Sequence, residues 1–211
     1  MCTYGGAPNR FPAKAAKEFV AALSSYDLTY DETFFEIHDR IARCGSAGKL
    51  DVAGLGAWKR SAQNKWLKPL METPEAAVRS ITTAAFASGL TDRQRVAQLR
   101  QLAGARTGDF AIGSAVLTAW DPDDYGVTDV HARQALHDLF DNCTCDLKDY
   151  DGAYLPAARA LRDVLNGCGS AGTGWTARKV DMALFKMDGV GDEPRTTPMG
   201  VLRSPTAAKK G

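Results

Sequence analysis

Apolar residues recur every three or four positions along most of this chain, and this spacing constrains the fold more than any other feature of the sequence. In residues 16–23, 34–44 and 78–86, for example, it places the apolar side chains on one face of a helix. Alternation of apolar and polar residues, which is typical of a half-buried strand, does not recur. The sequence therefore predicts an all-α protein with about nine helices.

Local signals indicate where several of these helices begin. Asp31 is a residue type that commonly caps a helix N-terminus, and Pro12 is suited to the first position of a helix. Residues 73–75 (Thr-Pro-Glu) combine a cap, a proline and an acid near the positive end of the helix dipole. Residues 91–94 resemble a capping box. The segment 110–120 is apolar on both faces, which predicts a buried central helix.

The length of 211 residues is enough for one sizeable core or for two small helical lobes that share a core. We expect a compact two-lobed helical domain over residues 1–191. Residues 192–211 contain no aromatic side chain and several Pro, Thr and Lys residues, so we expect a disordered tail there.

Composition narrows the cellular setting and the cofactors. No stretch approaches the roughly 20 apolar residues that span a bilayer, and residues 1–10 lack the apolar core of a secretory signal. We therefore expect a cytoplasmic monomer, associated with the nucleoid if the protein is bacterial, with no membrane partner. The cysteine spacing fits neither a zinc site nor an iron–sulfur cluster, which predicts free, reduced thiols and no metal or other cofactor. The five cysteines are Cys2, Cys44, Cys143, Cys145 and Cys168.

Residues 99–136 carry the functional signal. They read as a helix, a short hairpin with Gly104 and Gly108, a second helix, a loop and a third helix. Glycine lets the backbone approach a partner closely, and the first N–H groups of a helix have no intrahelical acceptor. Such a hairpin can hold a DNA phosphate through its backbone, with further contacts from Arg106 and Thr107. The alternative is an ordinary helix connection in which glycine ends the first helix.

This segment resembles the helix-hairpin-helix DNA glycosylase superfamily, nearest to the fold of the 8-oxoguanine glycosylases and endonuclease III. Residues 102–104 (Leu-Ala-Gly) are similar to the start of the family hairpin, with alanine in place of proline, and residues 114–117 are similar to its inward-facing helix. Residues 127–131 (Val-Thr-Asp-Val-His) are similar to the stretch that holds the catalytic aspartate. The resemblance covers about 40 residues and implies that Asp129 is the catalytic residue.

The hairpin is degenerate with respect to the family pattern. Arg106 stands where the family usually has its second glycine, and Gly108 or Asp109 stands where the bifunctional members carry a nucleophilic lysine. Without that lysine, Schiff-base chemistry and strand cleavage are not expected. The resemblance therefore implies a monofunctional enzyme that removes a damaged or modified base and leaves an abasic site.

A carboxylate suits this chemistry because cleavage of an N-glycosidic bond builds positive charge on the sugar. Asp129 can stabilise that charge or activate a water molecule, and a helix N-terminus favours its ionised form. The target base must first leave the DNA stack and enter a pocket. The aromatic candidates for the pocket wall are Phe34, Phe35, Trp58 and Trp120. The alternative role for Asp129 is a helix cap, and the two roles are compatible.

The formal net charge of +1 means that any DNA contact must come from a local basic face. Residues 58–68 contain four cations, two tryptophans and no acid, which makes Lys59, Arg60 and Lys65 candidate phosphate contacts. The alternative is a solvated helix face with its tryptophans in the core.

Three functions are compatible with these observations. The first is a base-excision-repair or modification glycosylase, a hydrolase, that acts on double-stranded DNA. The second is a non-catalytic helix-hairpin-helix protein that binds DNA in repair or phage defence. The third is a helical protein-interaction domain, which would show no salt-dependent DNA binding.

Overall fold

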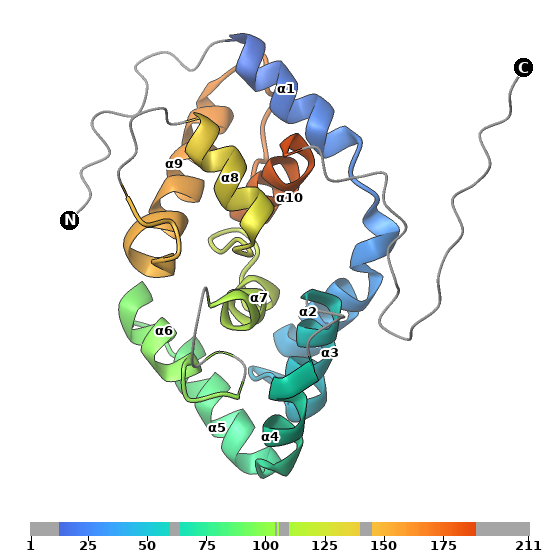
Figure 1. Ribbon diagram of the computed structural model, residues 1–211, viewed down its shortest axis with the longest axis vertical. Coiled ribbons are helices and arrows are strands. Elements are labelled where there is room, and N and C mark those ends of the chain that lie inside the picture. The colour runs from blue at the N-terminus through green and yellow to red at the C-terminus, as the bar shows by residue number, and fades with distance from the viewer. Residues whose placement is uncertain (1–12, 60–63, 104, 106–109, 140–144, 189–211) are drawn as a thin grey trace, which may run out of the picture.

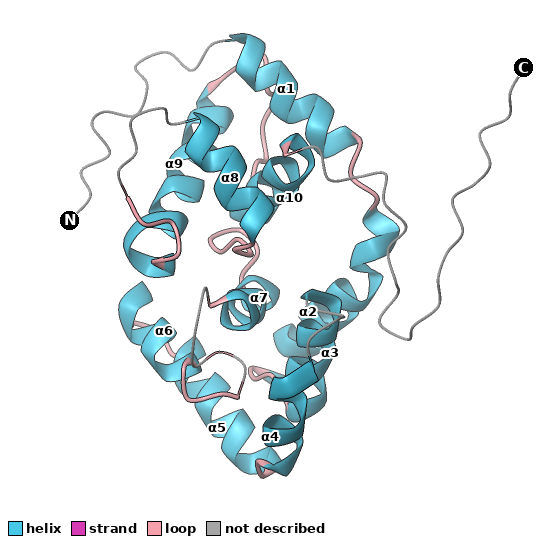
Figure 2. Ribbon diagram, viewed as in Figure 1, coloured by secondary structure: helices cyan, strands magenta, loops and turns pink. Residues whose placement is uncertain are grey.

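The computed structural model describes residues 13–59, 64–103, 105, 110–139 and 145–188. These residues form an all-helical fold, and none of them lies in a strand (Figure 2). The α-helices are α1 (Ala13–Ser24), α2 (Glu32–Cys44), α3 (Lys49–Lys59), α4 (Leu67–Glu72), α5 (Glu75–Phe86), α6 (Asp92–Leu99), α7 (Ala111–Trp120), α8 (Val130–Leu139), α9 (Leu155–Gly167) and α10 (Ala177–Met187). Shorter helical turns are η1 (Leu28–Asp31), η2 (Asn64–Trp66) and the π-helical η3 (Tyr150–Tyr154).

The helices pack in two groups with α7 between them (Figure 1). In the terminal group, α10 contacts α1, α8 and α9. In the central group, α3 contacts α2, α4 and α5, and α5 also packs on α6. Helix α7 lies against α2 and α3, and its C-terminal end leads into the loop that enters α8. The loop before α8 therefore runs from one group to the other, which is where a site shared by both groups can form.

Helix α7 is as buried as its sequence predicts. Every residue from Ala111 to Ala119 is buried, and most of them are small, so α2 and α3 can approach closely. Phe110, which precedes the helix, has a left-handed φ of 58°. Its fully buried ring lies over Gly113, where an added Cβ would be 2.2 Å from the ring. The close packing at the start of α7 thus depends on a residue without a side chain.

The helix signals in the sequence were partly right. Residues 91–94 form the predicted capping box at the start of α6. The prediction for residues 73–75 was wrong in detail: α5 begins at Glu75, and the Thr73 hydroxyl donates to the Pro69 carbonyl at the end of α4 instead of capping α5. Asp31 occupies the cap position of α2 but makes no capping hydrogen bond, because its carboxylate faces the interior.

Other predictions concern the cysteines, the membrane and the ends of the chain. Cys44 and Cys168 are free, but Cys145 is disulfide-bonded, so the prediction of reduced thiols was wrong for Cys145. No described helix combines the length and apolar character needed to cross a membrane. Pro12 and the predicted tail at 192–211 lie outside the described residues.

Replacing Gly113 with alanine is expected to lower the free energy of unfolding by about 1–3 kcal/mol, because the new methyl group overlaps the Phe110 ring, which is fully buried. The matched control is Gly167→Ala, at the end of α9, where nothing lies within 4 Å of the added Cβ. That change is expected to stabilise by up to about 1 kcal/mol. Urea unfolding measures both, and equal effects would contradict the proposed packing.

Candidate active site

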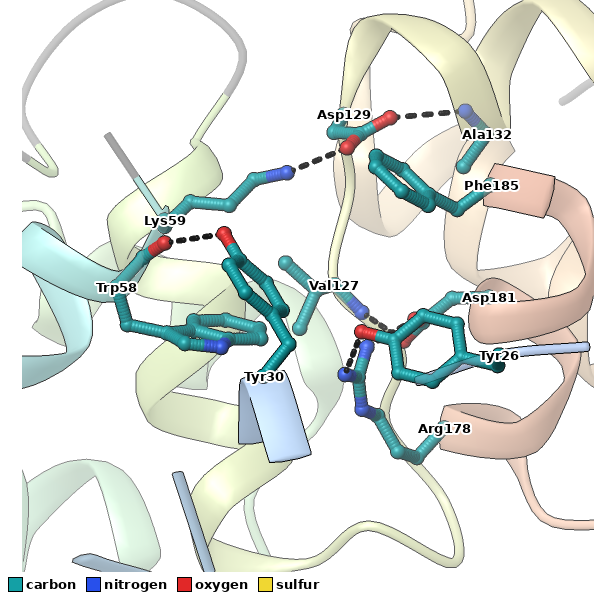
Figure 3. A pocket seen from close by; sticks show the side chains of 10 residues that line it. All are labelled: Tyr26, Tyr30, Trp58, Lys59, Val127, Asp129, Ala132, Arg178, Asp181 and Phe185. Atoms are coloured by element: carbon teal, nitrogen blue, oxygen red, sulfur yellow. Dashed lines mark hydrogen bonds and ion pairs between the residues drawn. The ribbon is translucent and has the colours of Figure 1, made fainter. Parts of the chain in front are cut away.

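Asp129 immediately precedes α8 and makes two kinds of contact. Its Oδ1 accepts a hydrogen bond from the backbone N–H of Ala132 at 2.9 Å, so the carboxylate does cap the helix. Its Oδ2 accepts one from the Lys59 ammonium at 2.8 Å (Figure 3). Lys59 is the last residue of α3, so this ion pair joins the central and terminal groups.

The ion pair is largely shielded from solvent, which affects the pKa of both partners. Burial of the Asp129 carboxyl disfavours its charged form, but the Lys59 ammonium and the Ala132 N–H outweigh burial and hold its pKa below the usual value. Burial lowers the pKa of the Lys59 amine, and the Asp129 carboxylate only partly offsets this effect. The site therefore holds an ionised carboxylate beside an amine that loses its proton more easily than an ordinary lysine.

The loop stretch 126–128 that presents Asp129 is held by four buried side chains. The hydroxyls of Tyr150 and Tyr154 each donate to a carbonyl oxygen of this stretch at 2.9 Å. Asp181 accepts from one of its N–H groups at 2.6 Å, and Ser114 accepts from another at 3.1 Å. Because these contacts come from η3, α10 and α7, the position of the carboxylate is fixed by several parts of the fold.

A cavity of about 70 Å³ lies beside the ion pair, between α3 and η1 on one side and α8 and α10 on the other. Figure 3 shows Trp58 and Tyr30 on one side of it and Phe185 and Tyr26 on the other, with Asp129 and Lys59 at one end. Its lining residues are Tyr26, Tyr30, Trp58, Lys59, Val127, Asp129, Ala132, Arg178, Asp181 and Phe185.

Arg178 and Asp181 line the more buried end of this cavity, and Arg178 also pairs with Asp31, which is not part of the lining. The Arg178 guanidinium pairs with both Asp31 and Asp181, and all three side chains are buried. Asp31 also accepts hydrogen bonds from the Tyr26 hydroxyl at 3.0 Å and from the Trp58 indole N–H at 3.2 Å. The network therefore connects η1, α3 and α10, which are far apart in the sequence.

Aromatic rings surround the same guanidinium. The carbon at its centre lies 5.2 Å from the ring centre of Trp58, 5.1 Å from that of Phe34 and 5.8 Å from that of Tyr26. A guanidinium is weakly hydrated and stacks well on aromatic faces, so it is the cation best suited to such an enclosed position.

Two carboxylates share one guanidinium here, and this affects the Asp181 side chain. Burial raises the pKa of Asp181 to about 7, because the attraction of Arg178 and the Val127 N–H offsets burial only in part while Asp31 adds repulsion. Burial likewise raises the pKa of Tyr26, so its hydroxyl keeps its proton. Asp181 is consequently a carboxyl group that gains and loses its proton near neutral pH.

The structure brings together some of the residues singled out in the sequence. Lys59 and Trp58 line the same cavity as Asp129. We had expected Lys59 to contact a phosphate, but its ammonium donates to the Asp129 carboxylate. Lys65 is exposed in η2 and lies outside the cavity lining. Arg60 and the hairpin residues Gly104, Arg106, Thr107 and Gly108 lie outside the described residues.

The other three aromatic candidates for the pocket wall lie away from this cavity. Phe34, Phe35 and Trp120 do not line the cavity. Phe34 lies behind Trp58 in the core, and Trp120 stacks on Phe86 in the central group. These predictions rested on residue type alone, which does not indicate which way a side chain faces.

Sequence reasoning missed Arg178 and Asp181, although one signal was present. They stand three positions apart on α10, on the same face as the apolar residues Ala177 and Leu184. Charges within the apolar face of a helix are costly to bury unless they are paired, so they indicate a partner from elsewhere in the fold. That partner, Asp31, could not be identified without the tertiary structure.

Comparison with protein-family models, with curated proteins and with solved structures finds no match for this chain. Among the described residues, no three His, Cys, Asp or Glu side chains gather so that they could hold a metal ion. The candidate active site is therefore interpreted from the chemistry of its own residues.

Replacing Arg178 with alanine is expected to lower the free energy of unfolding by about 3–5 kcal/mol, because it leaves Asp31 and Asp181 buried without a cation. The control is Lys68→Ala, which removes an exposed pair with Glu72 and should cost less than about 1 kcal/mol. Denaturant unfolding monitored by circular dichroism checks both. Similar losses in the two variants would contradict a structural role for the buried network.

The stability of the protein should also depend on the proton of Asp181. Between the unfolded pKa of 3.8 and the folded value of about 7, the folded state holds this proton and the unfolded state does not. The contribution of Asp181 is therefore full below pH 4 and is lost as the pH rises to 7, with a limiting slope of about 1.4 kcal/mol per pH unit.

The Asp181→Asn variant isolates this effect because it lacks the titrating proton. The difference in unfolding free energy between wild type and variant, measured by urea unfolding at pH 5, 6 and 7.5, should shift in favour of the variant as the pH rises. A difference that is constant over this range would mean that Asp181 does not change its protonation there.

Proposed function

We propose that this protein is a DNA glycosylase that hydrolyses the N-glycosidic bond of a flipped-out damaged or modified base. The observation that carries the proposal is the position of Asp129, an ionised carboxylate at one end of an aromatic-lined cavity. Duplex DNA is the proposed partner, with the hairpin at 104–108 as the proposed phosphate contact.

The exposure of the charged side chains indicates how the substrate would lie in the cavity. Lys59 and Asp129 are 12% and 16% exposed, whereas Arg178 and Asp181 are 7% and 4% exposed. The sugar and its C1′ would lie at the more accessible end, and the base would lie deeper, between the aromatic walls. Flat aromatic faces suit a base that has left its stack, since each base has a π-face of its own.

The proposed reaction needs only a carboxylate and water. As the bond between C1′ and the base nitrogen breaks, its electron pair leaves with the base, and C1′ becomes cationic. The Asp129 carboxylate stabilises this cation, and a water oxygen then bonds to C1′. One proton of the water is lost, the base gains one, and an abasic site remains.

Lys59 supports a second candidate, a glycosylase that also cleaves the strand. The sequence lacks a lysine after the hairpin, but α3 supplies one whose Nζ is 2.8 Å from Asp129 and whose pKa is lowered. A deprotonated amine can attack C1′ and displace the base. The nitrogen then loses a proton, the bond between C1′ and the ring oxygen breaks, and an imine between the lysine and C1′ remains. In the hydrolytic reaction, the same side chain only keeps Asp129 ionised.

A base-release assay tests the proposal. Duplexes that carry a panel of damaged and modified bases are incubated with the protein and then treated with alkali to reveal abasic sites. The Asp129→Asn variant should lose at least about 100-fold in rate, because an amide cannot stabilise the cation as a carboxylate does. Asparagine is also a good helix cap, so the N-terminal hydrogen bond of α8 is kept, and Lys59 can shed its charge because burial lowers the pKa of its amine. The control is Asp138→Asn, an exposed carboxylate on α8.

Trapping with borohydride separates the two mechanisms. If breaks form only after alkali and no covalent complex is trapped, the enzyme is monofunctional. A trapped complex that Lys59→Gln abolishes and Lys65→Gln retains would assign the lyase reaction to Lys59. If no base in the panel is released, while salt-sensitive DNA binding persists in wild type and in Asp129→Asn, the protein is a binding module and the glycosylase proposal fails.

A further inference from the structure

His131 follows Asp129 by two residues, and its imidazole ring is held in place from two sides. Its Nδ1 lies 2.7 Å from Oδ2 of Asp188, the residue that ends α10. The ring also packs edge-on against Phe185, with 5.6 Å between the ring centres and 89° between the ring planes. Phe185 lines the cavity, so the imidazole stands next to one wall of the candidate active site.

These contacts leave the second ring nitrogen of His131 available. A carboxylate only accepts hydrogen bonds, so Asp188 keeps a proton on Nδ1 and fixes the orientation of the ring. No described residue makes a hydrogen bond or an ion pair with Nε2. The side chain is 36% exposed, so Nε2 can exchange protons with solvent. A histidine that a carboxylate holds at one nitrogen and that is open at the other is suited to proton transfer.

His131 and Asp129 belong to the same turn at the start of α8. Burial opposes the ionised form of the Asp129 carboxyl, and a positive charge on His131 is one of the influences that lower the pKa of this carboxyl. The charged groups around the imidazole are Asp188 from α10 and Asp129 from the start of α8, with Lys59 from α3 beyond Asp129. Both side chains are therefore near the more accessible end of the cavity, where the sugar would lie.

The proposed hydrolysis needs a proton for the departing base, and Asp129 is ionised and cannot supply it. We infer that His131 is a further catalytic residue, the general acid that protonates the base as its bond to C1′ breaks. The electron pair of that bond leaves with the base, and the base takes the proton of Nε2. The attacking water releases one proton to solvent, and the neutral imidazole takes one up from solvent, so the cycle is balanced. This inference rests on the proposed function.

A general acid also indicates the class of base. A neutral base leaves as an anion unless it is protonated, so an acid accelerates its release. A base that is alkylated on a ring nitrogen, such as 7-methylguanine, is already cationic, leaves as a neutral molecule and needs no proton. His131 therefore assigns neutral bases to this site as the substrate class.

Single-turnover base release from duplexes that carry either a neutral modified base or 7-methylguanine tests the inference. His131→Gln should slow the release of neutral bases at least about 100-fold, and should change the release of 7-methylguanine and the affinity for the duplex by less than about 3-fold. The control is His137→Gln, an exposed histidine on the same helix. Asp188→Ala frees the ring and should slow the release of neutral bases at least about 10-fold, so the inference stays testable if His131→Gln does not fold.

The pH profile adds a readout that a structural role would not change. An ordinary imidazole loses its proton at about pH 6.5, so the wild-type rate for a neutral base should fall above neutral pH, and this fall should be absent in His131→Gln. Burial raises the pKa of Asp181 to about 7, so Asp181 titrates in the same range. A fall of equal slope in the variant would be due to Asp181 and would overturn the inference.

The outcomes separate this inference from the proposed function. If His131→Gln releases neutral bases as fast as wild type, or loses neutral and cationic bases equally, His131 is not the acid and the glycosylase stands. A loss of duplex affinity that equals the loss of rate would make His131 a phosphate contact and also overturn the inference. Wild type that releases only the cationic base contradicts it as well. If wild type releases no base from any duplex, the proposed function fails, and the inference fails with it.

Discussion

The guanidinium of Arg178 is shared by Asp31 and Asp181, and much of the molecule is arranged around this contact. It comes from α10, and its partners come from the turn before α2 and from α10 itself. Three charged groups in a protein interior are costly to desolvate, and the cost for each group is offset only while its partners stay in contact with it. The contact therefore fixes how the terminal group of helices meets η1 and α3 at this point.

The candidate active site depends on that arrangement. Asp181 holds the N–H of Val127, two residues before Asp129, while Asp31 holds the indole of Trp58, the residue before Lys59. Each member of the Lys59–Asp129 pair thus lies within two residues of a group fixed by the buried network. Electrostatic stabilisation of a developing charge is most effective when the stabilising group does not have to reorganise, and this geometry satisfies that condition.

The sequence predicted the helices well because apolar periodicity is a local property. The burial of α7 and the capping box at residues 91–94 follow from residues that are neighbours in the chain. Asp129 was predicted as the catalytic residue from a local pattern in the same way, and Lys59 was predicted as a phosphate contact from a local run of cations. Their contact was not predictable, because it joins positions 70 residues apart through the packing of two helix groups.

Asp129 performs a structural task and a proposed chemical task with different oxygen atoms. One oxygen caps α8 and the other meets Lys59. Asparagine keeps the capping oxygen but lacks the charge, so we expect Asp129→Asn to keep the cap of α8 and to lose the proposed chemistry. An enzyme and a binding protein with this architecture could therefore differ at one position only. A single substitution at Asp129 would then convert the proposed enzyme into a protein that binds its ligand without hydrolysing it, while the helical fold stays the same.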